Sequence, residues 1–253
     1  MVEIVYAPVI ALCRTAFRAL GMTVTVTGAE HIPTSGAAVL ASNHVSYLDF
    51  IFAGLAGAHA HRYVRFMAKQ GVFDHPVAGP LMRGMKHIPV DRDAGSTSFR
   101  TALTALKDDQ VVGIFPEATI SRSFTVKELK SGAVRLAQAS GAPLLPVAVW
   151  GGQRMFSKGV PRHLTRRGTH VLIDVGEPIP APRGPAGAAV EDELRRRLQQ
   201  MLGDLQARTP EQPRPGESAW WHPADRGGSA PTPEQALVLD EVDRQARAVR
   251  KAR

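Results

Sequence analysis

The chain has 253 residues, which is enough for one α/β domain with short extensions and too few for two full domains. Its 31 Lys and Arg residues outnumber its 23 Asp and Glu residues, and the formal net charge of +8 favours a negatively charged partner such as a membrane surface, a nucleic acid or a phosphorylated metabolite. The single cysteine, Cys13, excludes an intrachain disulfide and any multi-cysteine zinc or iron–sulfur site.

The first 23 residues are apolar but interrupted by charged residues and a proline. They therefore lack the roughly 20 continuous apolar residues that a membrane-spanning helix needs. Within residues 6–20, apolar residues recur at helical spacing with Arg14 and Arg18 beside them. This pattern predicts an amphipathic helix. We prefer the interpretation that it lies on an anionic bilayer, and the alternative is that it packs on the protein's own core.

A histidine follows the first buried strand. Residues 38–41 predict this strand and residues 50–55 predict the next helix, so His44 should lie at the strand's carboxyl end, where α/β proteins keep their active sites. The Asp49 carboxylate can accept the imidazole N–H and leave the other ring nitrogen to act as a base. No Gly-x-Ser-x-Gly elbow occurs in the sequence, so we infer that the substrate supplies the attacking hydroxyl. An ordinary loop with a helix cap is the alternative.

The rest of the chain alternates helical and strand patterns. This alternation predicts an α/β fold with a mostly parallel sheet covered by helices on both faces. Helices are expected at residues 96–106, 127–139 and 190–205, and strands at residues 111–115, 144–150 and 171–175.

The composition changes after residue 208. Residues 209–233 are rich in Pro, Gly and Ser and cannot order themselves alone, but we expect Trp220 and Trp221 to dock on the domain rather than at a bilayer interface. Residues 234–253 predict a solvated helix with a basic end. We therefore divide the chain into an N-terminal amphipathic segment at 1–23, the α/β domain at 24–208, and a Pro/Gly-rich extension with a charged helix at 209–253.

A carboxylate and several cations follow in further segments. Glu117 comes directly after the strand at 111–115, so it should emerge at the same sheet edge as His44, where it can hydrogen-bond a polyol. Thr119 can cap the next segment or contact an anion. Lys69 and Arg92 lie at opposite ends of the intervening segment, and cations so placed can hold a phosphate, although any one alone is more often a solvated surface charge.

Four sequence blocks occur in a fixed order. They are Asn-His-x-x-x-x-Asp at 43–49, a lysine followed by Ile-Pro-Val-Asp-Arg at 88–92, Phe-Pro-Glu-x-Thr at 115–119, and Leu-Leu-Pro-Val-Ala-Val-Trp-Gly at 144–151. Together they resemble the blocks of the glycerophospholipid acyltransferase family, of the lysophosphatidate acyltransferase type, over about residues 36–151. The resemblance implies that His44 is the catalytic base and Asp49 its orienting partner, that Lys69 and Arg92 are phosphate ligands, and that Glu117 contributes to acceptor binding or positions the catalytic region.

The third block departs from the family pattern. The family usually has Phe-Pro-Glu-Gly-Thr-Arg-Ser, whereas this chain has Ala118 in place of the glycine and Ile120 in place of the arginine. We expect Arg122 and Lys130 to supply the missing phosphate contact. Alternatively the acceptor differs, and is glycerol 3-phosphate or a glycolipid.

The resemblance therefore implies an enzyme that moves a fatty acyl group from acyl-CoA or acyl-carrier protein to a hydroxyl of lysophosphatidate or a related glycerophospholipid, without an acyl-enzyme. A thiolate leaves readily enough that no metal and no bound cofactor are expected. The basic residues 153–167 can receive coenzyme A phosphates, a carrier protein or lipid head groups, or can simply be solvated.

The expected partners are an anionic membrane surface and a lysophospholipid, with a peripheral or monotopic place on the cytoplasmic face of the cell membrane. No nucleic-acid-binding module pattern occurs in the sequence, so we do not expect a nucleic acid partner. A catalytically silent membrane adaptor would explain the basic charge, but not the joint occurrence of His44, Asp49, Arg92 and Glu117.

Overall fold

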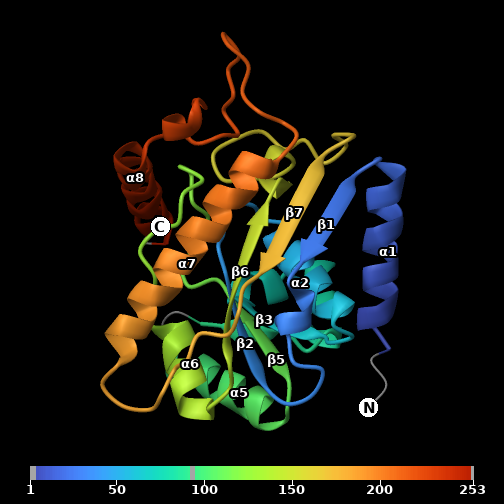
Figure 1. The fold of residues 1–253 in the computed structure, drawn as a ribbon, viewed down its shortest axis with the longest axis vertical. Coiled ribbons are helices and arrows are strands. Elements are labelled where there is room, and N and C mark those ends of the chain that lie inside the picture. Colours follow the sequence, from blue (N-terminus) through green and yellow to red (C-terminus); the bar gives the residue numbers. More distant parts are fainter. Residues whose placement is uncertain (1–3, 92–94, 252–253) are drawn as a thin grey trace.

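A seven-stranded sheet forms the centre of the computed structural model, which describes residues 4–91 and 95–251 (Figure 1). Its strands are β1 (Thr23–Thr27), β2 (Ala38–Ser42), β3 (Val64–Lys69), β4 (Ile88–Val90), β5 (Val111–Ile114), β6 (Leu144–Trp150) and β7 (His170–Val175), in the spatial order β1-β7-β6-β2-β5-β3-β4. Neighbouring strands are parallel except β6 and β7. The predicted mostly parallel sheet is confirmed.

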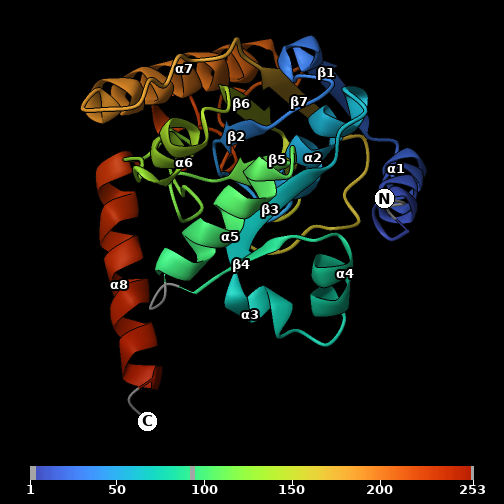
Figure 2. The same ribbon diagram turned by 90° about the horizontal axis from the view of Figure 1, so that it is seen from below.

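Helices cover both faces of this sheet (Figure 2). They are α1 (Tyr6–Ala19), α2 (Asp49–His59), α3 (Gln70–Phe73), α4 (Ala78–Gly84), α5 (Gly95–Lys107), α6 (Gly132–Ser140), α7 (Gly187–Arg208) and α8 (Pro233–Lys251), with short 3-10 turns at Ala29–His31, Gly152–Arg154 and Ala224–Arg226. Because side chains alternate along a strand, Val39 and Ala41 of β2 enter the core beneath α5, α6 and α7, whereas Leu40 enters the core beneath α2. This alternation makes β2 buried on both sides.

The predicted helix at 127–139 is wrong at its start, since α6 begins only at Gly132. The preceding backbone bonds elsewhere: the Lys127 N–H donates to Glu117 Oε2 at 3.0 Å and the Lys130 N–H donates to the Pro116 carbonyl at 2.8 Å. In a helix that began at Lys127, the Lys130 N–H would bond the carbonyl of residue 126, so its bond to Pro116 is incompatible with that start, whereas the Lys127 N–H would have no intrahelical partner in either case. The sequence analysis also did not anticipate β1, β3, β4, α3 and α4.

Helix α1 turns its apolar stripe toward the protein. Ile10 and Phe17 pack against the core on the α2 side, and the Tyr6 hydroxyl donates to the Val64 carbonyl at 2.9 Å. This packing favours the alternative interpretation of the N-terminal helix, although Leu12 on its other side remains 69% exposed. Docking of α1 on a membrane stays a prediction.

The C-terminal extension lies against the domain. Trp221 is buried in the core beneath α7, and Trp220 packs partly against the same cluster. The Arg154 guanidinium carbon lies 4.4 Å from the centre of the Trp221 ring, where the cation faces the π system. The expected docking of the two tryptophans is thereby confirmed. None of the helices in the described part of the chain has the length and apolar character needed to cross a membrane.

Candidate active site

The register of the sheet brings two of the predicted blocks together. Strands β2 and β5 are parallel neighbours, with Ala41 opposite Ile114, so the loops that follow them leave the same edge. The His44 N–H donates to Glu117 Oε1 at 2.7 Å, and the Ser121 N–H donates to the His44 carbonyl at 2.7 Å. The prediction that His44 and Glu117 emerge at one sheet edge is confirmed.

The His44 ring is held by Asp49. His44 Nδ1 lies 3.1 Å from Asp49 Oδ2, and the same oxygen accepts the backbone N–H groups of Val45 and Ser46 at 2.7 Å each. Burial raises the pKa of the Asp49 carboxyl, and these three contacts act in the opposite direction. The alternative interpretation of this segment was an ordinary hydrogen-bonded loop. Such a loop is present, and the bonds from the Val45 and Ser46 N–H groups orient the Asp49 carboxylate toward the His44 ring.

The His44 ring also stacks on an aromatic ring and is partly exposed to solvent. It stacks on Phe115, with ring centres 4.2 Å apart and planes inclined by 22°. The His44 side chain is 19% exposed. Within residues 4–91 and 95–251, no side chain hydrogen-bonds its other nitrogen, Nε2. A ring fixed at Nδ1 and accessible at Nε2 is the arrangement that a general base requires.

Glu117 bonds the backbone on both of its carboxyl oxygens. Oε1 accepts from His44 N–H and Oε2 from Lys127 N–H, and the side chain is only 4% exposed. Burial raises the pKa of Glu117 to about 8, against the lowering effect of the Lys127 and His44 N–H bonds. Of the two predicted roles, this geometry supports positioning of the loop that carries His44 over contact with the acceptor.

Two residues that frame the site were not predicted. Asn43 bonds Val149 of β6 twice, since its Nδ2 donates to the Val149 carbonyl at 3.0 Å and its Oδ1 accepts the Val149 N–H at 2.7 Å. The Ser157 hydroxyl donates to the Val45 carbonyl at 2.7 Å. The sequence signal for Asn43 is its place in the first block, directly before His44. Its partner is 106 residues away, so the contact itself depends on the fold.

The predicted phosphate ligands have different surroundings. Lys69 ends β3 with an exposed side chain, Lys130 is also exposed, and Arg92 lies outside the described residues. Thr119 Oγ1 accepts a hydrogen bond from Lys127 Nζ at 2.8 Å. Arg122 forms ion pairs with α8, as described below, while Ile120 is buried. The position of the missing arginine is thus filled by an apolar side chain, and Arg122 does not stand free.

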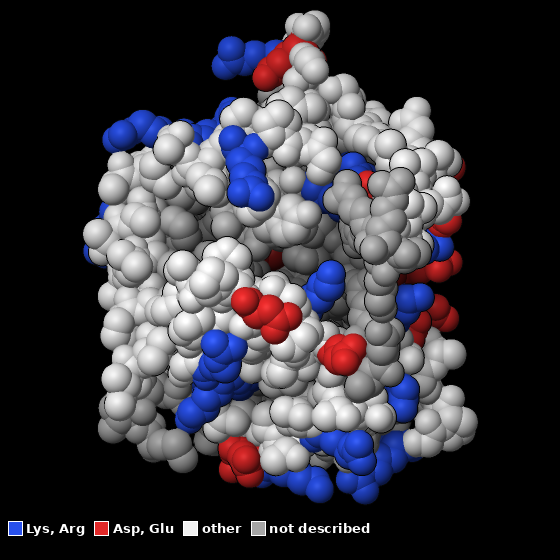
Figure 3. All heavy atoms as spheres, turned by 180° about the vertical axis from the view of Figure 1, so that it is seen from behind, with Lys and Arg blue, Asp and Glu red and all other residues white. Residues whose placement is uncertain are grey.

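The basic segment at 153–167 is partly engaged within the protein. Arg154 pairs with Glu211 at 3.0 Å, the Arg162 guanidinium lies 4.7 Å from the centre of the Phe156 ring, and Arg167 donates to the Ala19 carbonyl. Figure 3 shows basic and acidic side chains scattered over the face opposite to the view of Figure 1, with basic ones gathered along its lower edge and a hollow near its centre. Binding of phosphates or lipid head groups by residues 153–167 stays a prediction.

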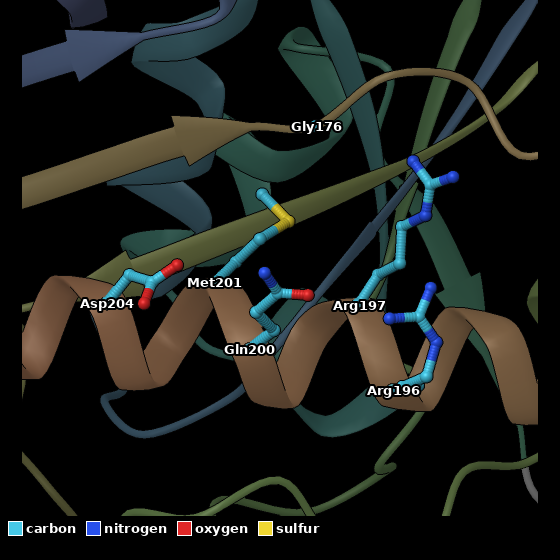
Figure 4. Close-up of a pocket in the computed structure, with 6 residues that line it drawn as sticks. All are labelled: Gly176, Arg196, Arg197, Gln200, Met201 and Asp204. Atoms are coloured by element: carbon cyan, nitrogen blue, oxygen red, sulfur yellow. The ribbon is translucent and has the colours of Figure 1, made fainter.

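Two surface hollows lie away from His44. One, of about 280 Å³, is lined by Gly176 at the end of β7 and by side chains of α7 (Figure 4). Figure 4 labels these α7 residues as Arg196, Arg197, Gln200, Met201 and Asp204. The other, of about 360 Å³, lies between α1, β1 and α2. None of the predicted site residues lines either hollow.

Comparisons with known proteins agree with this geometry. The model of the family described as Acyltransferase matches residues 23–150. The chain is 30% identical to a 1-acyl-sn-glycerol-3-phosphate acyltransferase of Bacillus subtilis over 72% of this chain and 89% of that protein. It is 32% identical to the mouse 1-acyl-sn-glycerol-3-phosphate acyltransferase alpha over 54% of this chain, but spans only 49% of that protein. The crystal structure of the PlsC acyltransferase from Thermotoga maritima shares the fold, with a TM-score of 0.67, 23% identity and 81% of each chain covered.

Proposed function

The chain belongs to the acyltransferase family, and we propose that it transfers a fatty acyl group from an acyl thioester to the free hydroxyl of lysophosphatidate. The pair His44–Asp49 carries the proposal, because it presents a fixed imidazole with one accessible nitrogen at the carboxyl end of β2. The names of the relatives from Bacillus subtilis and mouse support the choice of acceptor.

In the proposed reaction, His44 Nε2 takes the proton of the acceptor hydroxyl while the oxygen attacks the thioester carbonyl. The C–S bond breaks, the thiolate leaves, and the imidazolium returns the proton to it. Asp49 stabilises the imidazolium through Nδ1. General-base catalysis contributes about 10²- to 10⁴-fold. Glu117 takes no proton from substrate and acts by holding the backbone of His44 in place.

The donor is acyl-CoA or acyl-carrier protein, and we place the enzyme peripherally on the cytoplasmic face of the cell membrane, where its lipid acceptor resides. The exposed side chains Ile4 and Leu12, with Arg14 and Arg18 on the same helical segment, support contact with an anionic bilayer. Liposome flotation with and without anionic lipid tests this placement. Recovery of a Leu12→Ser/Arg14→Gln/Arg18→Gln variant equal to that of the wild type would reject α1 as the contact.

A second acceptor is favoured by one specific observation. Ile120 is buried at the position where the family pattern has an arginine, and Arg122 is engaged with α8. An acceptor that makes different phosphate contacts, such as glycerol 3-phosphate or a glycolipid, would be compatible with this change. A panel of lysophosphatidate, glycerol 3-phosphate, lysophospholipids and a phosphoinositide glycolipid, with one radiolabelled acyl-CoA, decides between them. A strong preference for lysophosphatidate would reject the second candidate.

The catalytic assignment is tested with His44→Ala. Transfer should fall by at least about 10²-fold while the protein stays folded by circular dichroism, because the base alone is lost. His59→Ala is the matched control, since His59 lies at the end of α2 and its Nδ1 hydrogen-bonds the Leu55 carbonyl at 2.8 Å rather than any predicted site residue. Wild-type turnover in His44→Ala would show that another group is the base.

A further inference from the structure

Three cations from two loops converge on two carboxylates of α8. Asp240 accepts from Lys127 Nζ and Lys158 Nζ at 2.5 Å each and lies 3.4 Å from Arg122 Nε. Asp243 accepts from Arg122 Nη2 at 2.7 Å and from Lys158 Nζ at 3.1 Å. The cation side chains are 10–21% exposed, so the group is a partly buried cluster rather than a set of loose surface charges.

The cations belong to the loops that hold the His44 segment. Arg122 follows Ser121, whose N–H bonds the His44 carbonyl, and the Lys127 N–H bonds Glu117. Lys158 follows Ser157, whose hydroxyl bonds the Val45 carbonyl. A ligand bound by these cations would therefore be held by the same frame that positions the catalytic histidine.

Helix α8 is attached to this cluster mainly by charge. Figures 1 and 2 show it along the outside of the molecule. Of its apolar side chains with described exposure, Ala236 is buried, on the same helix face as Asp240 and Asp243. Leu237, Val238, Leu239, Val242 and Val249 are exposed. Because little apolar surface is buried beneath the helix, a competing anion has only a modest hydrophobic contribution to overcome.

We propose that Arg122, Lys127 and Lys158 form a binding site for a phosphomonoester, and that α8 covers this site with Asp240 and Asp243 in place of the phosphate oxygens. The proposal rests on the proposed function, because both substrate classes bring such a group: lysophosphatidate as its head group and coenzyme A as its ribose phosphate. Two carboxylates and one phosphomonoester dianion carry about the same charge, and both accept several charge-assisted hydrogen bonds.

The ionisation of Asp240 is consistent with the replacement of the α8 carboxylates by a phosphate. Burial acts to raise the pKa of Asp240, but the hydrogen bonds from Lys127 and Lys158 keep it below the usual value. Asp240 is therefore ionised at neutral pH and competes directly with an anionic ligand. Arg122, Lys127 and Lys158 all lie outside the four sequence blocks. They would supply the positive charge that the third block lacks in this chain, where Ile120 stands in place of the arginine.

The test uses Asp240→Asn/Asp243→Asn in the full chain. Glu234→Gln/Glu241→Gln is the matched control, because it removes the same charge from α8 but none of the contacts to the cluster. We expect the KM of the phosphate-bearing substrate to fall by about tenfold in the first variant and to stay unchanged in the control. A fall for lysophosphatidate assigns the site to the acceptor. A fall for acyl-CoA that is absent with acyl-3′-dephospho-CoA assigns it to the donor. Unchanged or higher KM values for both substrates would overturn the proposal.

A second measurement separates this proposal from the proposed function. Amide hydrogen exchange of α8 is compared in inorganic phosphate and in chloride at equal ionic strength. Faster exchange in phosphate is expected, because the anion displaces the helix. If the wild-type chain acylates none of the acceptors, the proposed function fails and the exchange experiment alone decides. Equal exchange in the two salts would then overturn the phosphate site.

Discussion

Replacing Glu117 with alanine removes the acceptor of two partly buried backbone N–H groups. The side chain is 4% exposed, and its oxygens accept from His44 N–H at 2.7 Å and Lys127 N–H at 3.0 Å. A fully buried N–H left without a partner costs about 1 to 3 kcal/mol, and these two are only partly buried, so Glu117→Ala should lower the free energy of unfolding by at most about 6 kcal/mol. The loop that carries His44 also loses its anchor, and kcat should fall by as much as about 10²-fold.

Unfolding by urea at about pH 5 measures the stability, because the folded protein then keeps Glu117 protonated and bears no cost of a buried charge, its pKa being raised to about 8. Kinetics at about pH 7.5 measure kcat and the KM of the acceptor. Glu128→Ala is the control, because Glu128 is exposed on the same loop and its loss should change stability by less than about 0.5 kcal/mol. Equal stability of the two variants would refute the reasoning. A higher acceptor KM with unchanged kcat would mean that Glu117 binds the acceptor instead.

Three further predictions concern stability. The contribution of Glu117 to the free energy of unfolding should fall as the pH rises from 4.5 to about 8, by up to about 1.4 kcal/mol per pH unit, because burial raises the pKa of Glu117 and the folded protein keeps a proton that the unfolded chain releases. His87, whose pKa burial lowers to about 4, acts in the opposite direction below about pH 6.5, so the Glu117 contribution is read as the difference between the wild type and Glu117→Gln. Denaturation at several pH values checks this, and a Glu117→Gln variant with the wild-type slope would contradict it. Asn43→Ala should lower the free energy of unfolding by about 2 to 6 kcal/mol, because it leaves the N–H and the carbonyl of Val149 unpaired. Urea denaturation measures this loss, and an unchanged midpoint would show that the two bonds contribute little. Trp221→Ala should lower the free energy of unfolding by about 3 to 5 kcal/mol and Trp220→Ala clearly less, since Trp221 is buried in the core and Trp220 only partly. Equal losses in urea denaturation would argue against the docking of Trp221 in the core.

Local sequence patterns were sufficient to predict the strands and helices whose burial repeats at a regular spacing along the chain. The apolar run of β2, the helical spacing of α5 and the strand β6 with the bounds 144–150 were all predicted, because burial on one or both sides leaves a periodic signature in the sequence. The pairing of His44 with Asp49 was also predictable, since both lie in one short segment that ends a strand and begins a helix. Parallel strands then place Glu117 at the same edge.

Contacts between distant segments required the tertiary structure. The bond from the Lys130 N–H to the Pro116 carbonyl delays the start of the helix expected at 127–139 to Gly132, and the pairing of Asn43 with Val149 joins residues 106 positions apart. Helix α8 has the sequence pattern of a solvated helix, yet Asp240 meets Lys127 and Lys158 across 113 and 82 residues. The sequence by itself determined the α/β class and the pairing of His44 with Asp49, because periodicity and short-range spacing encode them. Which cations gather, and which carboxylate neutralises them, depends on how the chain folds back, and that was decided only by the tertiary structure.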